Sequence, residues 1–184
     1  MITLKYINLV NNALKRIWSD NYEEILGSLL GKSYTELSTK SQYVDLLESL
    51  IDLWGESAEK MFARLGEVVG ESLIPEVDKN IEGSKSDRFH VLVGNTLDCL
   101  EEVFMTKLVV LDSYPKFIRF HIENCYCEDE LLDDDFCATD LIIEGIFMGL
   151  MKKVLGLPKC EVCYVCKDIE DEERCEFELY SERR

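Results

Sequence analysis

The chain has 184 residues, with 37 acidic against 20 basic side chains and a formal net charge of -17 at pH 7. This length predicts one domain with a buried core, and the negative charge disfavours nucleic acids and anionic membranes as partners. The N-terminus lacks the pattern of a signal peptide, and no apolar run is long enough for a membrane span. The composition therefore predicts a cytoplasmic protein whose partner has a basic face.

The first two-thirds of the chain reads as a series of amphipathic helices, because apolar residues recur at intervals of three and four. Ser41 and Ser57 stand where helices are expected to begin, and Gly31 and Gly55 where they are expected to end. Pro75 is expected to kink or end the fourth helix. We therefore expect helices over residues 4–19, 22–30, 41–54, 57–74 and 87–104.

The last third of the chain changes in period and predicts a small antiparallel sheet crossed by one helix. The predicted strands are residues 117–122, 161–166 and 175–180, the last two joined by the acidic turn 168–173. Residues 141–155 read as an apolar helix, in which Gly145 and Gly149 predict close packing against a neighbour. The fold class is therefore α+β, with a helical lobe over about residues 1–110 and an α/β subdomain over about residues 111–184.

Cysteines cluster near the end of the sequence. Cys160, Cys163, Cys166 and Cys175 follow the spacing C-x-x-C-x-x-C-x8-C, and Cys137 lies upstream of them. Thiolates at such short intervals, in a chain without an export signal, favour a tetrahedral zinc site. An iron–sulfur cluster, a disulfide between neighbouring strands and unliganded buried thiols are the alternatives.

The other cysteines and the carboxylates point to no further chemistry. Cys99 lies on an apolar helix face and is expected to be an inert core residue. Cys125 and Cys127 are interpreted as packing residues or as adventitious sites of oxidation. The sequence has no nucleophile–base pair and no glycine-rich phosphate loop, and its carboxylates lie in charge runs typical of a solvated surface. It is therefore not expected to be an enzyme.

Several motifs, in their order along the chain, resemble the heme nitric-oxide/oxygen binding (H-NOX) family nearly from end to end. These motifs are YINLVNNAL at 6–14, YEEIL at 22–26, SAEKMFARLG at 57–66, GNTL at 94–97, and Glu144-Gly145 with Gly149. The vinyl-4-reductase-type sensor domains are similar in fold and end in a similar cysteine pattern. The resemblance implies a sensor or signal-transduction domain that changes its contacts with a separate effector, such as a histidine kinase or a cyclase.

The sequence departs from this family at the residues that hold the heme. The position of the heme-ligating histidine falls on Leu108 or Lys107, depending on the motif from which it is counted. The three Tyr-x-Ser-x-Arg positions that bind the heme propionates fall on Leu132, Asp134 and Phe136. Heme is therefore not expected. We expect the pocket between the lobes to be apolar and partly filled by aromatic side chains, Phe89 and Phe104 among them.

The sequence contains other candidate ligands to the heme iron. The two histidines, His90 and His121, are interpreted as a helix-surface residue and a strand residue with ordinary hydrogen bonds. Met105 or a cysteine could ligate heme in principle, but no heme-binding motif accompanies them.

A subset of the family also carries a zinc site beyond the heme pocket, and this part of the resemblance assigns the ligands. It implies Cys137, Cys163, Cys166 and Cys175, with Cys160 as the next candidate. Cys163 and Cys166 would face opposite sides of a regular strand, so a bulge or tight bend is expected between them. The zinc would be redox-responsive or purely structural. The alternative functions are a ligand-carrier or assembly module with structural zinc, and a genuine heme and nitric oxide sensor with a non-standard ligand.

Overall fold

The computed structural model describes residues 3–31, 37–104, 106–123, 138–157, 161–169 and 172–181, with the backbone alone at residues 40, 161–169 and 172–175. Its elements are α1 (Leu4–Trp18), α2 (Tyr22–Leu30), α3 (Lys40–Trp54), α4 (Ala58–Val77), α5 (Lys85–Phe104), β1 (Leu108–Tyr114), β2 (Phe117–Ile122), α6 (Ala138–Val154), β3 (Glu161–Ile169) and β4 (Glu172–Tyr180). Single 3-10 turns, η1 (Ser19–Asn21) and η2 (Gly55–Ser57), precede α2 and α4. The predicted α+β class is confirmed.

The helices begin and end largely where the sequence predicts. The hydroxyl of Thr3 accepts a hydrogen bond from the backbone N–H of Tyr6 and so caps α1. The start of α3 is a correction, because Thr39 and Gln42 form a capping box there and the predicted cap, Ser41, lies inside the helix. Pro75 lies in the last turn of α4, which ends two residues later at Val77.

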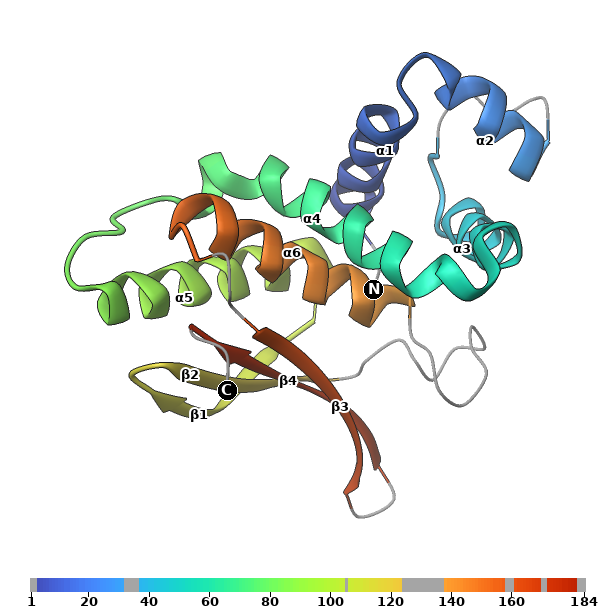
Figure 1. Cartoon of the computed structure of the whole chain (residues 1–184). Coiled ribbons are helices and arrows are strands. Elements are labelled where there is room, and N and C mark those ends of the chain that lie inside the picture. Colours follow the sequence, from blue (N-terminus) through green and yellow to red (C-terminus); the bar gives the residue numbers. More distant parts are fainter. Residues whose placement is uncertain are drawn as a thin grey trace.

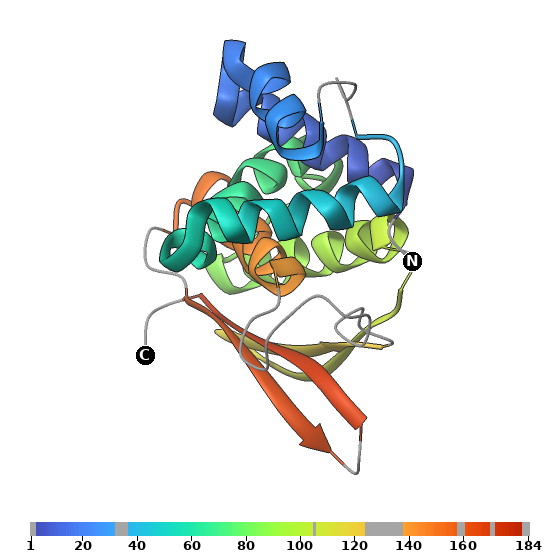
Figure 2. The ribbon, with the colours of Figure 1, turned by 90° about the vertical axis from the view of Figure 1, so that its right-hand side faces the viewer.

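The helices and the sheet form layers (Figure 1). The four strands are antiparallel in the order β1-β2-β4-β3, and α5 and α6 lie on one side of them. Figure 2 shows α1 and α2 on the far side of the helical layer from the sheet.

The core between α6 and the sheet is aromatic, because the ring of Phe120 packs against Phe147 at 5.4 Å and against Phe177 at 5.1 Å between centroids. Among the residues described, no helix has the length and apolar character needed to cross a membrane.

Two features of the sheet differ from the prediction. β1 was not predicted, because its register with β2 shifts between Val110 and Asp112, and the exposed Val110, Leu111 and Tyr114 break the alternation of buried and exposed positions. β3 and β4 are each three residues longer than predicted, so most of the supposed acidic turn belongs to the strands. Among the described residues, the sheet therefore has four strands, with β1 and β3 at its edges.

A buried polar cluster positions the N-terminal helices. The side-chain amide of Asn11 donates to the carbonyl of Leu37 at 2.9 Å, and its oxygen accepts from the hydroxyl of Tyr22 at 2.7 Å and from the N–H of Leu37 at 3.2 Å. Asn11 is 1% exposed, so every one of these bonds forms away from water. This network fixes α1 against α2 and against the segment that leads into α3.

Candidate functional site

The helices α4 and α6 cross in backbone contact through glycines. A Cβ placed on Gly145 would lie 2.1 Å from the carbonyl oxygen of Ala63 and 2.8 Å from the Cα of Gly66, and a Cβ on Gly66 would lie 2.1 Å from the carbonyl oxygen of Ile142. Gly70 and Gly149 are in similar contact with the backbone of the facing helix. The predicted close packing of Gly145 and Gly149 is confirmed, and on α4 the equally spaced Gly66 and Gly70 take part in the same helix contact.

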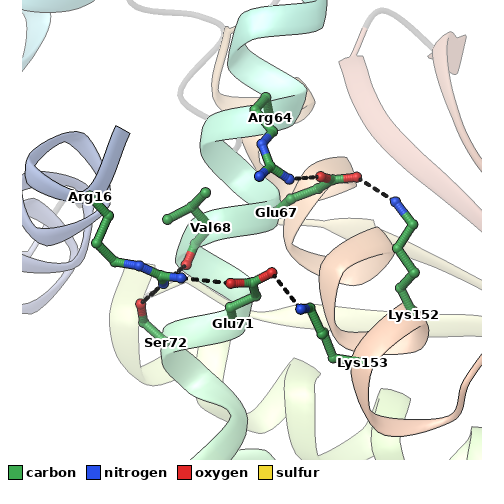
Figure 3. Close-up of polar contacts among 8 residues, drawn as sticks. All are labelled: Arg16, Arg64, Glu67, Val68, Glu71, Ser72, Lys152 and Lys153. Atoms are coloured by element: carbon green, nitrogen blue, oxygen red, sulfur yellow. Dashed lines mark hydrogen bonds and ion pairs between the residues drawn. The ribbon is translucent and has the colours of Figure 1, made fainter. Parts of the chain in front are cut away.

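Two carboxylates on α4 lie between cations of α1, α4 and α6 (Figure 3). Glu67 pairs with Arg64 of its own helix and accepts from Lys152 of α6 at 3.2 Å. Glu71 accepts from Arg16 of α1 at 2.7 Å and pairs with Lys153 of α6 at 3.4 Å. The ion pairs therefore join α1, α4 and α6 beside the glycine contact.

These contacts change how the two carboxyl groups titrate. Burial alone would raise the pKa of Glu67, but the hydrogen bonds from Arg64 and Lys152 outweigh it and hold that pKa below its ordinary value. The pKa of Glu71 is lowered chiefly by the hydrogen bond from Arg16, with a further contribution from Lys153. Both carboxylates are therefore ionised near neutral pH and stabilise the packed helices.

Glu71→Gln is expected to destabilise the fold at neutral pH and to have less effect in acid. The folded-state pKa of Glu71 lies below the ordinary value of 4.5. The stabilisation that ionised Glu71 gives to the fold is therefore complete above the ordinary pKa of 4.5 and is lost as the pH falls through the lower folded-state pKa. We expect a loss of about 0.5–1 kcal/mol at pH 7, measured by urea unfolding, and a smaller loss near the pKa of the folded state.

The control for this measurement is Glu82→Gln, which changes an exposed carboxylate in the loop between α4 and α5. That variant should match the wild type at both pH values. An equal loss of stability by Glu71→Gln at neutral and acid pH would contradict an ionic role for Glu71.

A surface pocket lies beside the same helices. It is lined by Lys60 and Arg64 of α4 and by Glu144 and Met148 of α6, together with residues of the glycine contact. Burial, assisted by the nearby charge of Glu59, raises the pKa of Glu144 above its ordinary value. Glu67 also lines the pocket, which therefore combines both signs of charge with the side chain of Met148. Sequence analysis missed it, because its residues come from helices that are distant in the chain.

The interior between the N-terminal helices and α5 is closed by aromatic side chains. The ring of Tyr6 on α1 lies 4.5 Å from the ring of Phe104 on α5 and 5.4 Å from that of Tyr43 on α3, measured between centroids. The hydroxyls of Tyr6 and Tyr43 are hydrogen-bonded at 2.9 Å. Phe89 is fully buried and Phe104 is 3% exposed. The two phenylalanines that were predicted to help fill the pocket between the lobes are therefore core residues.

Neither residue at the expected ligand position offers a nitrogen or sulfur atom to a buried iron. The Lys107 side chain is 68% exposed and pairs with Glu123 at 3.7 Å. Leu108 is buried and apolar, at the first position of β1. The three positions expected to bind the heme propionates, Leu132, Asp134 and Phe136, lie outside the described residues. Met105 also lies outside them.

The two histidines lie in different surroundings. The Nδ1 atom of His90 on α5 is 3.3 Å from the hydroxyl of Ser113 on β1, as expected for an ordinary hydrogen bond. His121 on β2 is 8% exposed, and its Nδ1 has no hydrogen-bond partner in the described structure. The expectation of ordinary hydrogen bonds is therefore wrong for this atom of His121. The two rings lie on separate elements and form no shared site.

The cysteines of the predicted zinc site are described only in part. Cys137 and Cys160 lie outside the described residues, as do Cys125 and Cys127. In the β3–β4 ladder, Cys163 stands opposite Glu178, whereas Cys166 stands opposite Cys175. The ladder is continuous from Glu161 to Ile169, so the bulge predicted between Cys163 and Cys166 is wrong. The ligand assignment itself stays a prediction.

The remaining evidence on thiols and metals concerns the described side chains. Among them, no group of three or more histidine, cysteine, aspartate or glutamate residues is placed to hold a metal ion. Cys99 is buried, and its burial together with the charge of Glu76 raises the pKa of its thiol to about 11. Cys99 is therefore a protonated core residue near neutral pH, as predicted.

Comparison with known proteins places the fold. No protein-family model matches the sequence, and a search of curated proteins finds no match. An oxygen-binding H-NOX domain related to soluble guanylate cyclases matches with a TM-score of 0.64 at 7% identity, over 97% of this chain and 94% of that one. A mutant H-NOX domain of T. tengcongensis matches with a TM-score of 0.61 at 10% identity, over 95% and 96% of the two chains. The chain therefore has an H-NOX-like fold.

Proposed function

We propose that the chain is a sensor or signal-transduction domain that uses the H-NOX-like fold without heme and acts through a separate effector protein. The observation that carries the proposal is the contact of Tyr6, Tyr43 and Phe104 where α1, α3 and α5 meet. The fold is that of H-NOX domains along nearly the whole chain, while these side chains occupy the space between its helices.

The residues present do not fit a heme held as the resemblance implies. The exposed Lys107 and the apolar Leu108 stand where a histidine would be needed. The α5 side chains that face the core are apolar or, in the case of Thr96, bonded to the helix itself through the carbonyl of Leu92 at 2.7 Å. Making room for a heme in a core packed in this way would cost folding free energy, because the side chains around the new cavity would lose buried apolar area and van der Waals contacts.

In this function, α4 and α6 transmit a signal between the two ends of the domain. Backbone contact at Gly66 and Gly145 allows little independent movement of these helices. Glu71 connects them to α1 through Arg16. A change at the sheet, on which α6 packs through Phe147, would therefore reach the N-terminal helices. The stimulus that we propose is a change in the cysteine site of β3 and β4, with zinc as the bound metal.

The effector is proposed to be a histidine kinase or a cyclase, the classes that the family resemblance implies. The net charge of -17 supports a partner surface that is basic, since complementary charge accelerates association and excludes like-charged partners. A test adds the purified chain to a candidate kinase or cyclase from the same source and measures autophosphorylation or cyclase rate, with the chain in its reduced and oxidised forms. A rate that is unchanged by both forms would count against this part of the proposal.

The heme-free state has its own test and expected outcome. Freshly purified protein should show no Soret absorption, and titration with hemin should produce no saturable species of the kind that apomyoglobin gives in parallel. The physical reason is that Tyr6 and Phe104 would have to separate and no ligand would be gained. Stoichiometric hemin binding that yields a five-coordinate ferrous form able to bind nitric oxide would contradict the proposal.

A further inference from the structure

Two cysteines of the terminal strands stand directly opposite each other. Cys166 of β3 and Cys175 of β4 are register partners in an antiparallel ladder. The Cα atoms of directly opposite residues are about 4.5–5.5 Å apart in such a ladder, and a disulfide spans Cα separations of about 4.4–6.8 Å. Cys163, the third cysteine of these strands, stands opposite Glu178. The backbone therefore places one cysteine pair of these two strands at disulfide distance.

This pair marks the position where the sheet narrows. The pairing of β2 with β4 ends at Ile122, which stands opposite Cys175. The pairing of β3 with β4 continues beyond Cys166 as far as Ile169, opposite Glu172. Figure 1 shows this end of β3 and β4 projecting away from the helices and from the other two strands. Cys166 and Cys175 therefore stand at the base of a two-stranded projection, which we call the terminal ribbon (residues 167–169 and 172–174).

In the strand register that the structure describes, the residues of the terminal ribbon pair only with one another. Isolated two-stranded hairpins are marginally stable in water. In the register of the ribbon, Lys167 stands opposite Arg174, and Asp168 stands opposite Glu173. Like charges directly opposite each other destabilise a strand pair. The order of the ribbon therefore depends on how firmly its base is held.

We propose that Cys166 and Cys175 form a reversible disulfide that clamps the base of the terminal ribbon. With a hydroperoxide as oxidant, one thiolate attacks the peroxide oxygen, the O–O bond breaks, and a sulfenic acid and water are formed. The second thiolate attacks the sulfenic sulfur and displaces hydroxide, which leaves as water. Two thiols and one hydrogen peroxide thus give one disulfide and two waters, and a dithiol reductant reverses the bond by exchange.

The disulfide and the proposed zinc site use the same two cysteines, so one excludes the other. The disulfide is inferred from the strand register alone and does not require zinc or the sensor function. If zinc is bound, it should slow the oxidation of Cys166 and Cys175, because coordinated thiolates are less available to peroxide. If the purified protein holds no zinc, the disulfide should still form. The two proposals can therefore fail separately.

The test uses the full chain, reduced and treated with EDTA, then exposed to a small excess of hydrogen peroxide. Free thiols are alkylated, and peptides are mapped under non-reducing conditions by mass spectrometry. The main cross-link should join Cys166 to Cys175. Hydrogen exchange at the amides of the terminal ribbon should slow by about tenfold or more on oxidation and should recover with dithiothreitol. Zinc content is measured on the untreated protein, and that result bears on the zinc proposal alone.

Matched variants make the assignment specific. Cys163→Ser should keep both the cross-link and the slowed exchange, whereas Cys175→Ser should lose both. If Cys175→Ser does not fold, as judged by circular dichroism, the peptide map of the wild type still decides the assignment. A main cross-link that involves Cys163 or Cys160, or an unchanged exchange rate in the terminal ribbon of the cross-linked protein, would overturn the proposal.

Discussion

Gly145→Ala is expected to lower the unfolding free energy by about 3 kcal/mol or more, because the added methyl group has no space. Its carbon would lie 2.1 Å from the carbonyl oxygen of Ala63 and 2.8 Å from the Cα of Gly66, and both of these are backbone atoms. The helices α4 and α6 would have to separate along their contact. In a chain of this length the loss corresponds to a fall in Tm of about 6–12 °C, measured by thermal unfolding.

The matched control is Gly94→Ala, which makes the same chemical change inside another helix. Among the described residues, apart from its chain neighbours and the backbone of its own helix, no atom lies within 4 Å of a Cβ placed on Gly94 in α5. Alanine has the higher helix propensity by about 0.8–1 kcal/mol, so this variant should be as stable as the wild type or more stable. If Gly145→Ala and Gly94→Ala had the same effect, the close contact of α4 with α6 would not be what requires glycine at position 145.

The glycine contact also shows how far the sequence can predict packing. The spacing of Gly145 and Gly149 predicts a close approach but does not identify the facing helix. Gly66 and Gly70 have the same spacing and carry the missing signal. Pairing the two motifs in advance would have predicted the crossing of α4 and α6. The ion pairs of Glu67 and Glu71 could not be predicted in this way, since they depend on how the crossed helices are rotated.

The strands are less predictable than the helices, for reasons visible in particular residues. The helices bury one continuous face, so their three- and four-residue periods survive in the sequence. In β1, by contrast, Val110, Leu111 and Tyr114 are exposed apolar residues at an edge, and the register shift at Leu111 removes the two-residue period. Acidic residues such as Asp168 and Glu173 are uncommon in strands, yet here they continue β3 and β4.

The cysteine site shows a different limit of sequence reasoning. The spacing of Cys163 and Cys166 favours a metal site and led us to expect a bend between them, but β3 runs without that bend. Zinc binding by both thiols would therefore require β3 to deform between these two residues. The register instead pairs Cys166 with Cys175, and this juxtaposition cannot be read from spacing, because it depends on the length of the connection between β3 and β4. The sequence places Cys137 immediately before the first residue of α6, but Cys137 lies outside the described residues.

Removal of zinc is the second change from which we expect a large effect. We expect the reduced protein to hold one zinc ion per chain, bound by Cys137, Cys163, Cys166 and Cys175 with Zn–S distances of about 2.3 Å. At a free zinc concentration 1,000 times the Kd, binding adds about 4 kcal/mol to the stability of the folded state. Chelation should then lower the Tm by about 8–16 °C for a chain of this length.

Single substitutions test which thiols contribute to that zinc site, with metal content per chain measured by elemental analysis. Cys175→Ser should lose the zinc, whereas Cys99→Ser, which changes a buried cysteine on α5, should keep it. The unbroken register makes Cys163→Ser the most informative variant, because Cys163 stands opposite Glu178 and not opposite a cysteine. If Cys163→Ser kept its full zinc content, Cys163 would not be a ligand, and Cys160 would take its place in the assignment. Full zinc content in Cys175→Ser would contradict the ligand assignment as a whole, because the metal would then bind without the only cysteine of β4.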